Sequence, residues 1–274
     1  MLSYRHGFHA GNLADVFKHC TLTAVLDAVI GKPAPLAYVD THAGAGLYPL
    51  DDDGEQCGGV VPLRAHPREP MPHCVSRYLD CVGSLNTGTS LRRYPGSAMI
   101  AAHLLRPTDR LLLCERHPAD HASLRQTLRA DPRVQIACDD GYALLKAVLP
   151  PRERRGVILI DPAYELADEP QRLIDGLKSA LARFGHGVYL VWYPLHGKHD
   201  PVALKRRYRH LGPPKTLCIE LDPHQPTARG ATGSGLLIVN PPYQAVAEIE
   251  LLTAFLGRAL APNGRAVCDW LVGE

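Results

Sequence analysis

Short aliphatic runs bounded by glycine, proline or charged residues recur along the chain. The most apolar of them, Gly156–Ile160, places four consecutive aliphatic side chains between a glycine and the dipeptide Asp161-Pro162. A run of this kind is typical of a strand that is buried on both faces. Similar runs predict seven strands in all, at Leu36–Asp40, Arg110–Glu115, Val134–Ala137, Val157–Asp161, Val188–Trp192, Thr216–Leu221 and Leu236–Val239.

Segments with helical periodicity lie between several of these strands. Asn12 is a suitable N-cap for a helix that runs through about Ile30, with an apolar face formed by Leu13, Val16, Phe17, Cys20 and Ala24. Further helices are predicted at Ala119–Arg129, Gly141–Val148 and Gln171–Arg183. The alternation of strands and helices predicts an α/β fold with a doubly wound, mostly parallel sheet.

One interval is longer than this fold requires. More than sixty residues separate Gly46 from Arg110, where a single crossover would suffice. Prolines and glycines interrupt its first half, and a helix is predicted near His73–Ser84. We interpret residues 48–94 as an inserted small helical subdomain beside the ligand cleft, with 1–47 and 95–274 forming the main domain. A long disordered loop is the alternative.

The composition is that of an ordinary soluble enzyme. The chain has 274 residues, 46% hydrophobic and 21% charged, which is enough to bury a sizeable core. No stretch approaches the ~18 apolar residues of a membrane span. The first residues also lack the apolar segment of a signal peptide. We therefore expect a cytoplasmic protein with no membrane span.

Cysteines, histidines and net charge narrow the function only a little. The eight cysteines include no C-x-x-C pair, which favours free thiols in a reducing compartment over zinc or disulfides. His6, His9 and His19 match no metal-binding motif, so no metal is expected. The net charge of +2 and the basic segment Lys205–His210 are compatible with RNA but do not require it. The sequence leaves the oligomeric state open and is compatible with a monomer.

The tetrapeptide Asp161-Pro162-Ala163-Tyr164 follows the most apolar strand. Open α/β sheets bind their ligands at the carboxyl ends of their strands. A carboxylate, a turn that exposes a carbonyl, and an aromatic ring together suit a flat base held by its exocyclic amine. An alternative is that Asp161 caps the next helix and Tyr164 only packs.

Other strand ends carry residues that suit a nucleoside. The first strand leads into Thr41–Gly46, whose glycines allow close approach of a ligand, although the third glycine of a dinucleotide fingerprint is missing. Glu115 could accept two ribose hydroxyls, and Asp140 could accept an adenine amine, with the Gly141 N–H directed at a ring nitrogen. Each acid could instead cap a helix. Their order along the chain predicts one cleft that holds an adenosyl group beside a second, amine-bearing ring.

A second tetrapeptide, Asn240-Pro241-Pro242-Tyr243, matches an amine-binding motif better by residue type. It follows the last predicted strand, however, far from the switch point expected near the first and fourth strands. We therefore favour Asp161 as the acid of the site.

At these residues the chain resembles the bacterial 23S rRNA (adenine-N6)-methyltransferase J family over essentially its whole length. The most specific matches are Met1–Asn12, Asp40–Gly46, Tyr94–Ser97 and Gly156–Tyr164. The resemblance implies a seven-stranded Rossmann-like methyltransferase fold with an inserted helical subdomain. It also implies S-adenosylmethionine as the cofactor, and 23S ribosomal RNA as the partner, in which one adenine is methylated at N6.

The resemblance implies roles for individual residues as well. It suggests Asp161 as the catalytic acceptor, with Pro162 and Tyr164 of the same motif, and Tyr4 as a positioning residue near the site. It also suggests cofactor contacts from His19, His42, Ser97, Glu115, Asp140 and Gly141. From the sequence alone His42 could equally be structural, and Ser97 could be only an N-cap. Ala163 departs from the family motif, which has a second proline there, so the turn is less rigid.

Three alternatives stay open at this stage. An amine methyltransferase acting on DNA or on a protein amide would use the same tetrapeptide. A non-catalytic RNA-binding protein could have kept the fold, given Ala163. A nicotinamide dehydrogenase is disfavoured by the missing third glycine.

Overall fold

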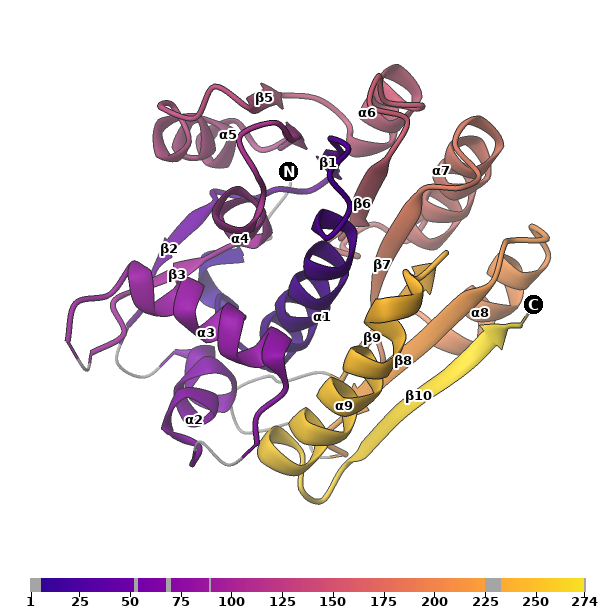
Figure 1. The fold of residues 1–274 in the computed structure, drawn as a ribbon. Coiled ribbons are helices and arrows are strands. Elements are labelled where there is room, and N and C mark those ends of the chain that lie inside the picture. The colour runs from indigo at the N-terminus through magenta and orange to yellow at the C-terminus, as the bar shows by residue number, and fades with distance from the viewer. Residues whose placement is uncertain (1–5, 52–53, 68–69, 89, 225–232, 274) are drawn as a thin grey trace.

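An eight-stranded sheet crosses the part of the molecule that the structure, a computed structural model, describes (Figure 1): residues 6–51, 54–67, 70–88, 90–224 and 233–273. The strands lie in the order β10-β8-β9-β7-β6-β1-β4-β5. Their bounds are β1 Ala37–Asp40, β4 Arg110–Cys114, β5 Val134–Ala137, β6 Gly156–Ile160, β7 Val188–Pro194, β8 Thr216–Asp222, β9 Ser234–Val239 and β10 Arg265–Val272. A separate hairpin pairs β2, Leu47–Pro49, with β3, Arg93–Pro95.

Strand direction identifies the ligand-binding edge of this sheet. β5, β4, β1, β6 and β7 are parallel, whereas β9 is antiparallel to both β7 and β8. β1 pairs with β4 on one side and with β6 on the other, so the strand order reverses there. In a doubly wound sheet, the carboxyl ends of such strands flank the ligand crevice. This is the Rossmann-like arrangement expected of the chain.

All seven predicted strands are present, each with bounds within two residues of the prediction. The predicted count is nevertheless wrong, because β10 adds an eighth strand, antiparallel to β8. β10 lies at the edge of the sheet and is half exposed, and Arg265 and Asp269 interrupt its apolar pattern. An edge strand needs no continuous apolar run, which is why the pattern did not reveal it.

Helices cover both faces of the sheet. Side chains of α1, α4, α5 and α9 share one apolar cluster with Val157 and Leu159, while those of α6, α7 and α8 share another with Ile158 and Ile160. Successive side chains of β6 therefore point into two different cores, one on each face of the sheet, as its continuous apolar run predicted. The helix bounds are α1 Leu13–Ile30, α4 Ser97–Leu104, α5 Pro118–Thr127, α6 Gly141–Val148, α7 Glu169–Arg183, α8 Pro201–Arg209 and α9 Tyr243–Leu260.

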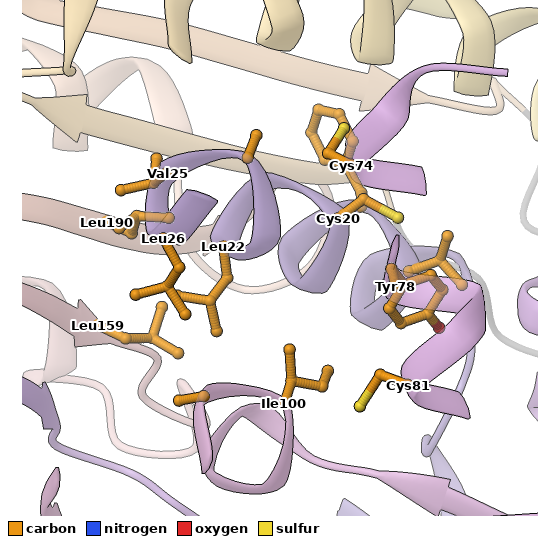
Figure 2. Packing of buried hydrophobic residues seen from close by; sticks show 14 of the residues in the cluster. Cys20, Leu22, Val25, Leu26, Cys74, Tyr78, Cys81, Ile100, Leu159 and Leu190 are labelled. Atoms are coloured by element: carbon orange, nitrogen blue, oxygen red, sulfur yellow. The ribbon is translucent and has the colours of Figure 1, made fainter. Parts of the chain in front are cut away.

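Helix α1 begins at the predicted N-cap, since the Asn12 side chain accepts the Asp15 N–H at 2.9 Å. The expectation of one apolar face was too narrow, because every residue from Asp15 to Leu26 is buried. Figure 2 shows why: Leu26 lies toward Leu159 and Leu190 of the sheet, and Cys20 lies beside Cys74. A helix that is covered on all sides is part of the core.

Residues 48–94 contain η2 Glu55–Gly58, α2 Val60–Ala65 and α3 His73–Ser84, and lie largely between the hairpin strands β2 and β3. The predicted helix at His73–Ser84 is confirmed. Its buried face, including Tyr78, packs against α1 and joins the same apolar cluster as the sheet. The division into a main domain and a subdomain stays a prediction.

The described part of the chain contains no helix long and apolar enough to cross a membrane. Within the same ranges no cluster of histidine, cysteine and carboxylate side chains has the arrangement of a metal site. The eight cysteines are free thiols.

Candidate active site

A cavity of about 230 Å³ lies at the carboxyl ends of the parallel strands. Its walls come from the segments after β1, β4, β5 and β6, from helix α1, and from Trp192 of β7. Most of the predicted site residues line it: His19, His42, Ser97, Glu115, Asp140, Gly141, Asp161 and Pro162. The prediction that these strand ends share one cleft is therefore confirmed in geometry, while the role of each residue stays a prediction.

The loop after β1 turns sharply beneath the cavity. Gly44 has φ +62°, and a Cβ there would lie 1.9 Å from the hydroxyl oxygen of Tyr48. Its N–H donates to Oε2 of Glu115 at 2.9 Å. Only glycine allows this backbone position, which brings the loop against the acid that follows β4.

Glu115 is held by backbone groups on both oxygens. Besides Gly44, the His117 N–H donates to Oε1 at 2.7 Å. Burial raises the pKa of this carboxyl above its usual value, against the effect of these hydrogen bonds. A carboxylate oxygen can accept two hydrogen bonds, so each oxygen keeps a site for a ligand hydroxyl.

Asp140 caps helix α6, as the alternative interpretation proposed. Its Oδ1 accepts the N–H groups of Tyr142 at 2.9 Å and Ala143 at 3.2 Å. Its Oδ2 forms an ion pair with Arg172, and Arg116 lies 3.6 Å away. Gly141 is the first residue of α6, a position whose N–H has no partner inside a helix.

Two histidines of the cavity are neutral at pH 7. Burial lowers the pKa of His42 to about 4 and that of His19 to about 3. Nδ1 of His42 lies 2.8 Å from Oγ1 of Thr41, and Nδ1 of His19 lies 2.8 Å from the Tyr94 hydroxyl. Each ring is thus oriented through one nitrogen.

Asp40, at the end of β1, does not line the cavity but supports Ser97, which does, and the sequence reasoning gave it no role. It is fully buried and accepts hydrogen bonds from the hydroxyls of Ser97 at 2.7 Å and Tyr38 at 2.8 Å. Burial raises its pKa to about 6. Ser97 is the first residue of α4, and Gly96 is the N-cap, so the N-cap alternative for Ser97 is wrong.

Asp161 is held by a buried lysine that was also missed. Nζ of Lys18 lies 2.5 Å from Oδ2 of Asp161 and 2.9 Å from Oδ1 of Asp15. Nε2 of His6 contacts the other Asp15 oxygen at 2.9 Å. These contacts form a continuous polar chain from the N-terminal segment to the acid after β6.

The charges in this chain stabilise one another. Burial alone would lower the pKa of Lys18, but the carboxylates of Asp15 and Asp161 raise it above its usual value. Burial would raise the pKa of Asp15, yet His6 and Lys18 hold it well below its usual range. A lysine and an aspartate among apolar residues of α1 were the available sequence signal, since unpaired charges are rarely buried.

Tyr164 lies behind the cavity wall rather than on it. It is 7% exposed, has φ +53°, and donates its hydroxyl to the Trp192 carbonyl at 3.0 Å. The two rings meet edge to face at 5.7 Å, and Trp192 lines the cavity. Trp192 is therefore an aromatic wall of the site that the sequence did not reveal.

Two other predictions concern Tyr4 and the second tetrapeptide. Tyr4 lies outside the described residues. Asn240 follows β9, which is antiparallel to β7. The second tetrapeptide therefore lies where β7 begins, at the side of the sheet opposite the cavity. Its side-chain amide donates to the carbonyls of Gly185 at 2.9 Å and Gly187 at 2.8 Å.

Comparison with known proteins gives a consistent result. The family model described as "Ribosomal RNA large subunit methyltransferase D, RlmJ" matches residues 33–272. Two proteins named "Ribosomal RNA large subunit methyltransferase J", from Haemophilus influenzae and Escherichia coli K12, are each 38% identical over the full length of both chains. The crystal structure of protein LPL1258 from Legionella pneumophila superposes with a TM-score of 0.89 at 37% identity, covering 96% of this chain and 98% of that one.

Proposed function

Because the chain belongs to the RlmJ family of ribosomal RNA large subunit methyltransferases, we propose that it methylates N6 of one adenine in 23S rRNA, with S-adenosylmethionine as donor. The position of Asp161 is the observation that best supports an amine as the group that is methylated. This acid lies at the carboxyl end of β6, in the same cavity as the residues suited to a nucleoside. A cytoplasmic location, where ribosomal RNA is available, is part of the proposal.

The residues of the cavity fit this cofactor. Both oxygens of Glu115 can accept a ribose hydroxyl, and the Gly141 N–H can donate to a ring nitrogen. A Cβ on Gly141 would lie 2.3 Å from the Thr41 carbonyl oxygen, so only glycine brings this N–H so close to the loop after β1. The neutral His42 can donate a hydrogen bond to the carboxylate of the cofactor. When bound, S-adenosylmethionine supplies a methyl group on a positively charged sulfur.

Asp161 and the Pro162 carbonyl would each accept one N–H of the adenine amine. Lys18 binds Oδ2 of Asp161, and no residue that the structure describes donates a hydrogen bond to Oδ1. This oxygen is the one left for the amine. A carboxylate is too weak a base to deprotonate the neutral amine, so Asp161 acts by orienting the nitrogen lone pair.

Charge develops on the nitrogen as the new bond forms, and Asp161 then stabilises the transition state more than the ground state. After transfer, Asp161 can accept the proton that the nitrogen loses. The adenine must leave its stack to reach this depth, as bases do in other enzymes that modify them. Trp192 offers a ring face or edge inside the cavity, with Tyr164 fixed behind it.

The test is Asp161→Ala, compared with the wild type on 23S rRNA from cells lacking the enzyme. Radiolabelled methyl transfer should fall by about 10²–10⁴-fold, the usual contribution of a positioned acid or base. Calorimetric binding of S-adenosylmethionine should persist, because the cofactor contacts are elsewhere. Mapping of the methylated nucleotide identifies the target. Retained turnover would contradict the role of Asp161, and transfer to DNA rather than RNA would support the alternative substrate class.

A further inference from the structure

Phe8 is held in solvent by a turn that is itself well anchored. It belongs to the short helix η1, His6–Phe8, and is 75% exposed. On either side of it, His6 contacts Asp15 at 2.9 Å and Nδ1 of His9 contacts Glu55 at 2.9 Å. The His9 N–H also donates to the His6 carbonyl at 2.8 Å. The backbone is fixed, so the ring is presented outward.

The position of this turn distinguishes Phe8 from other exposed apolar residues. His6 and His9, which flank Phe8 on this turn, both line the cavity, so the backbone of Phe8 lies beside the cavity wall while its ring is in solvent. The His6–Asp15–Lys18–Asp161 chain connects the same turn to the proposed catalytic acid through three contacts of 2.5–2.9 Å. Single exposed apolar residues are common and need no explanation. An exposed aromatic ring on a turn whose two histidines line the proposed base-binding cavity is a different case.

We propose that Phe8 stacks on the RNA base next to the target adenine and fills the gap that the adenine leaves. The inference rests on the proposed function. When one base leaves a stack, its neighbours lose their stacking partner, and this loss opposes extrusion. A flat apolar ring inserted beside them restores part of it, as apolar wedges do in other nucleic-acid complexes. Any base has a stacking face, so this contact needs no sequence preference.

The proposal predicts a substrate-dependent defect. The experiment compares two RNA substrates that carry the mapped target adenine in the same sequence. One is paired with a complementary strand, and the other is single-stranded. Phe8→Ala should lower kcat/KM at least about tenfold on the paired RNA, within the range of base–aromatic stacking, and less than about threefold on the single strand. Phe8→Trp should retain activity on both. Tyr243→Ala, which removes a 90% exposed aromatic ring at the opposite edge of the sheet, should change neither.

A second measurement follows the base directly. With 2-aminopurine in place of the target adenine, the wild type and Phe8→Trp should increase fluorescence on binding the paired RNA, and Phe8→Ala should not. Equal losses of Phe8→Ala on both RNAs, or no loss on either, would overturn the proposal, as would an unchanged fluorescence response. A wild type inactive on both RNAs would instead refute the proposed function, and the role of Phe8 with it.

Discussion

Two similar tetrapeptides lie at opposite ends of the parallel strands of the sheet. Asp161-Pro162-Ala163-Tyr164 follows the parallel strand β6, and its first three residues line the cavity, whereas Asn240-Pro241-Pro242-Tyr243 follows the antiparallel strand β9. Asp161 and Asn240 are both polar residues at a strand end, but Asp161 faces a cavity and a buried lysine. Asn240 uses its amide to donate hydrogen bonds to two backbone carbonyls of the turn between α7 and β7.

The aromatic residues of the two segments differ in the same way. Tyr164 is 7% exposed and packs against Trp192, while Tyr243 is 90% exposed at the start of α9. The motif with the better residue match is thus the one away from the cavity. Strand direction, rather than residue identity, determines which polar strand end can meet a ligand.

Among substitutions that test the difference between the two segments, the largest loss of stability is expected at Lys18. Lys18→Met leaves Asp15 and Asp161 without their cation, and loss of one partner from a buried ion pair costs about 3–5 kcal/mol. Lys205→Met is the matched control, because its partner Glu220 keeps Arg265 at 3.2 Å. Chemical denaturation measures both free energies of unfolding. Equal losses in the two variants would show that the charges at the cavity are not specially coupled.

A smaller effect is expected from His42, also at the cavity edge. Its folded pKa of about 4 lies below the unfolded value of 6.5, so between these values the unfolded state binds more protons. Its contribution to stability is therefore full above pH 6.5 and falls as the pH drops toward 4, by up to about 1.4 kcal/mol per unit.

His42→Gln should flatten this slope in thermal or urea unfolding followed from pH 7 to pH 4. The exposed His103→Gln, on α4, is the control and should leave the slope as in the wild type. Asp40, whose pKa is raised to about 6, contributes a slope of the opposite sign in the same range and is present in all three proteins. A slope unchanged by His42→Gln would contradict the lowered pKa of this ring.

The smallest effect is expected at Asn240. Asn240→Gly keeps the left-handed backbone, φ +51°, and removes the hydrogen bonds to Gly185 and Gly187. Stability should fall by about 1–2 kcal/mol, and methyl transfer should stay within about twofold of the wild type. An activity loss comparable to that of Asp161→Ala would place the second tetrapeptide in the reaction and reverse the comparison.

The fold could be predicted because it is encoded in local patterns. Aliphatic runs between turn residues identified seven strands, and Asn12 marked the start of α1. β10 was missed because an edge strand carries a weak apolar pattern. The same local reasoning gave α1 only one apolar face, since the segment that covers its other side lies far along the chain.

Only the residues of the site that follow a parallel strand could be predicted from the sequence pattern. Glu115, Asp140 and Asp161 all follow parallel strands, and the sheet brings them together. The contact between Lys18 and Asp161 joins residues 143 positions apart, so no local pattern reveals it. The burial of Asp40 beneath Ser97, and the choice of Trp192 rather than Tyr164 as the cavity wall, likewise depend on tertiary packing.

Helix α1 has one further consequence for the evolution of this enzyme. From Asp15 to Leu26 it has no solvent-facing side, and the ammonium that holds Asp161 projects from this stretch. A substitution in the distant residues that cover the helix, such as Cys74 or Tyr78 of α3, therefore alters the packing of the helix that carries this ammonium. If Asp161 aligns the reacting amine as proposed, sequence change in the 48–94 segment is constrained by this packing, although its α3 residues line no part of the cavity.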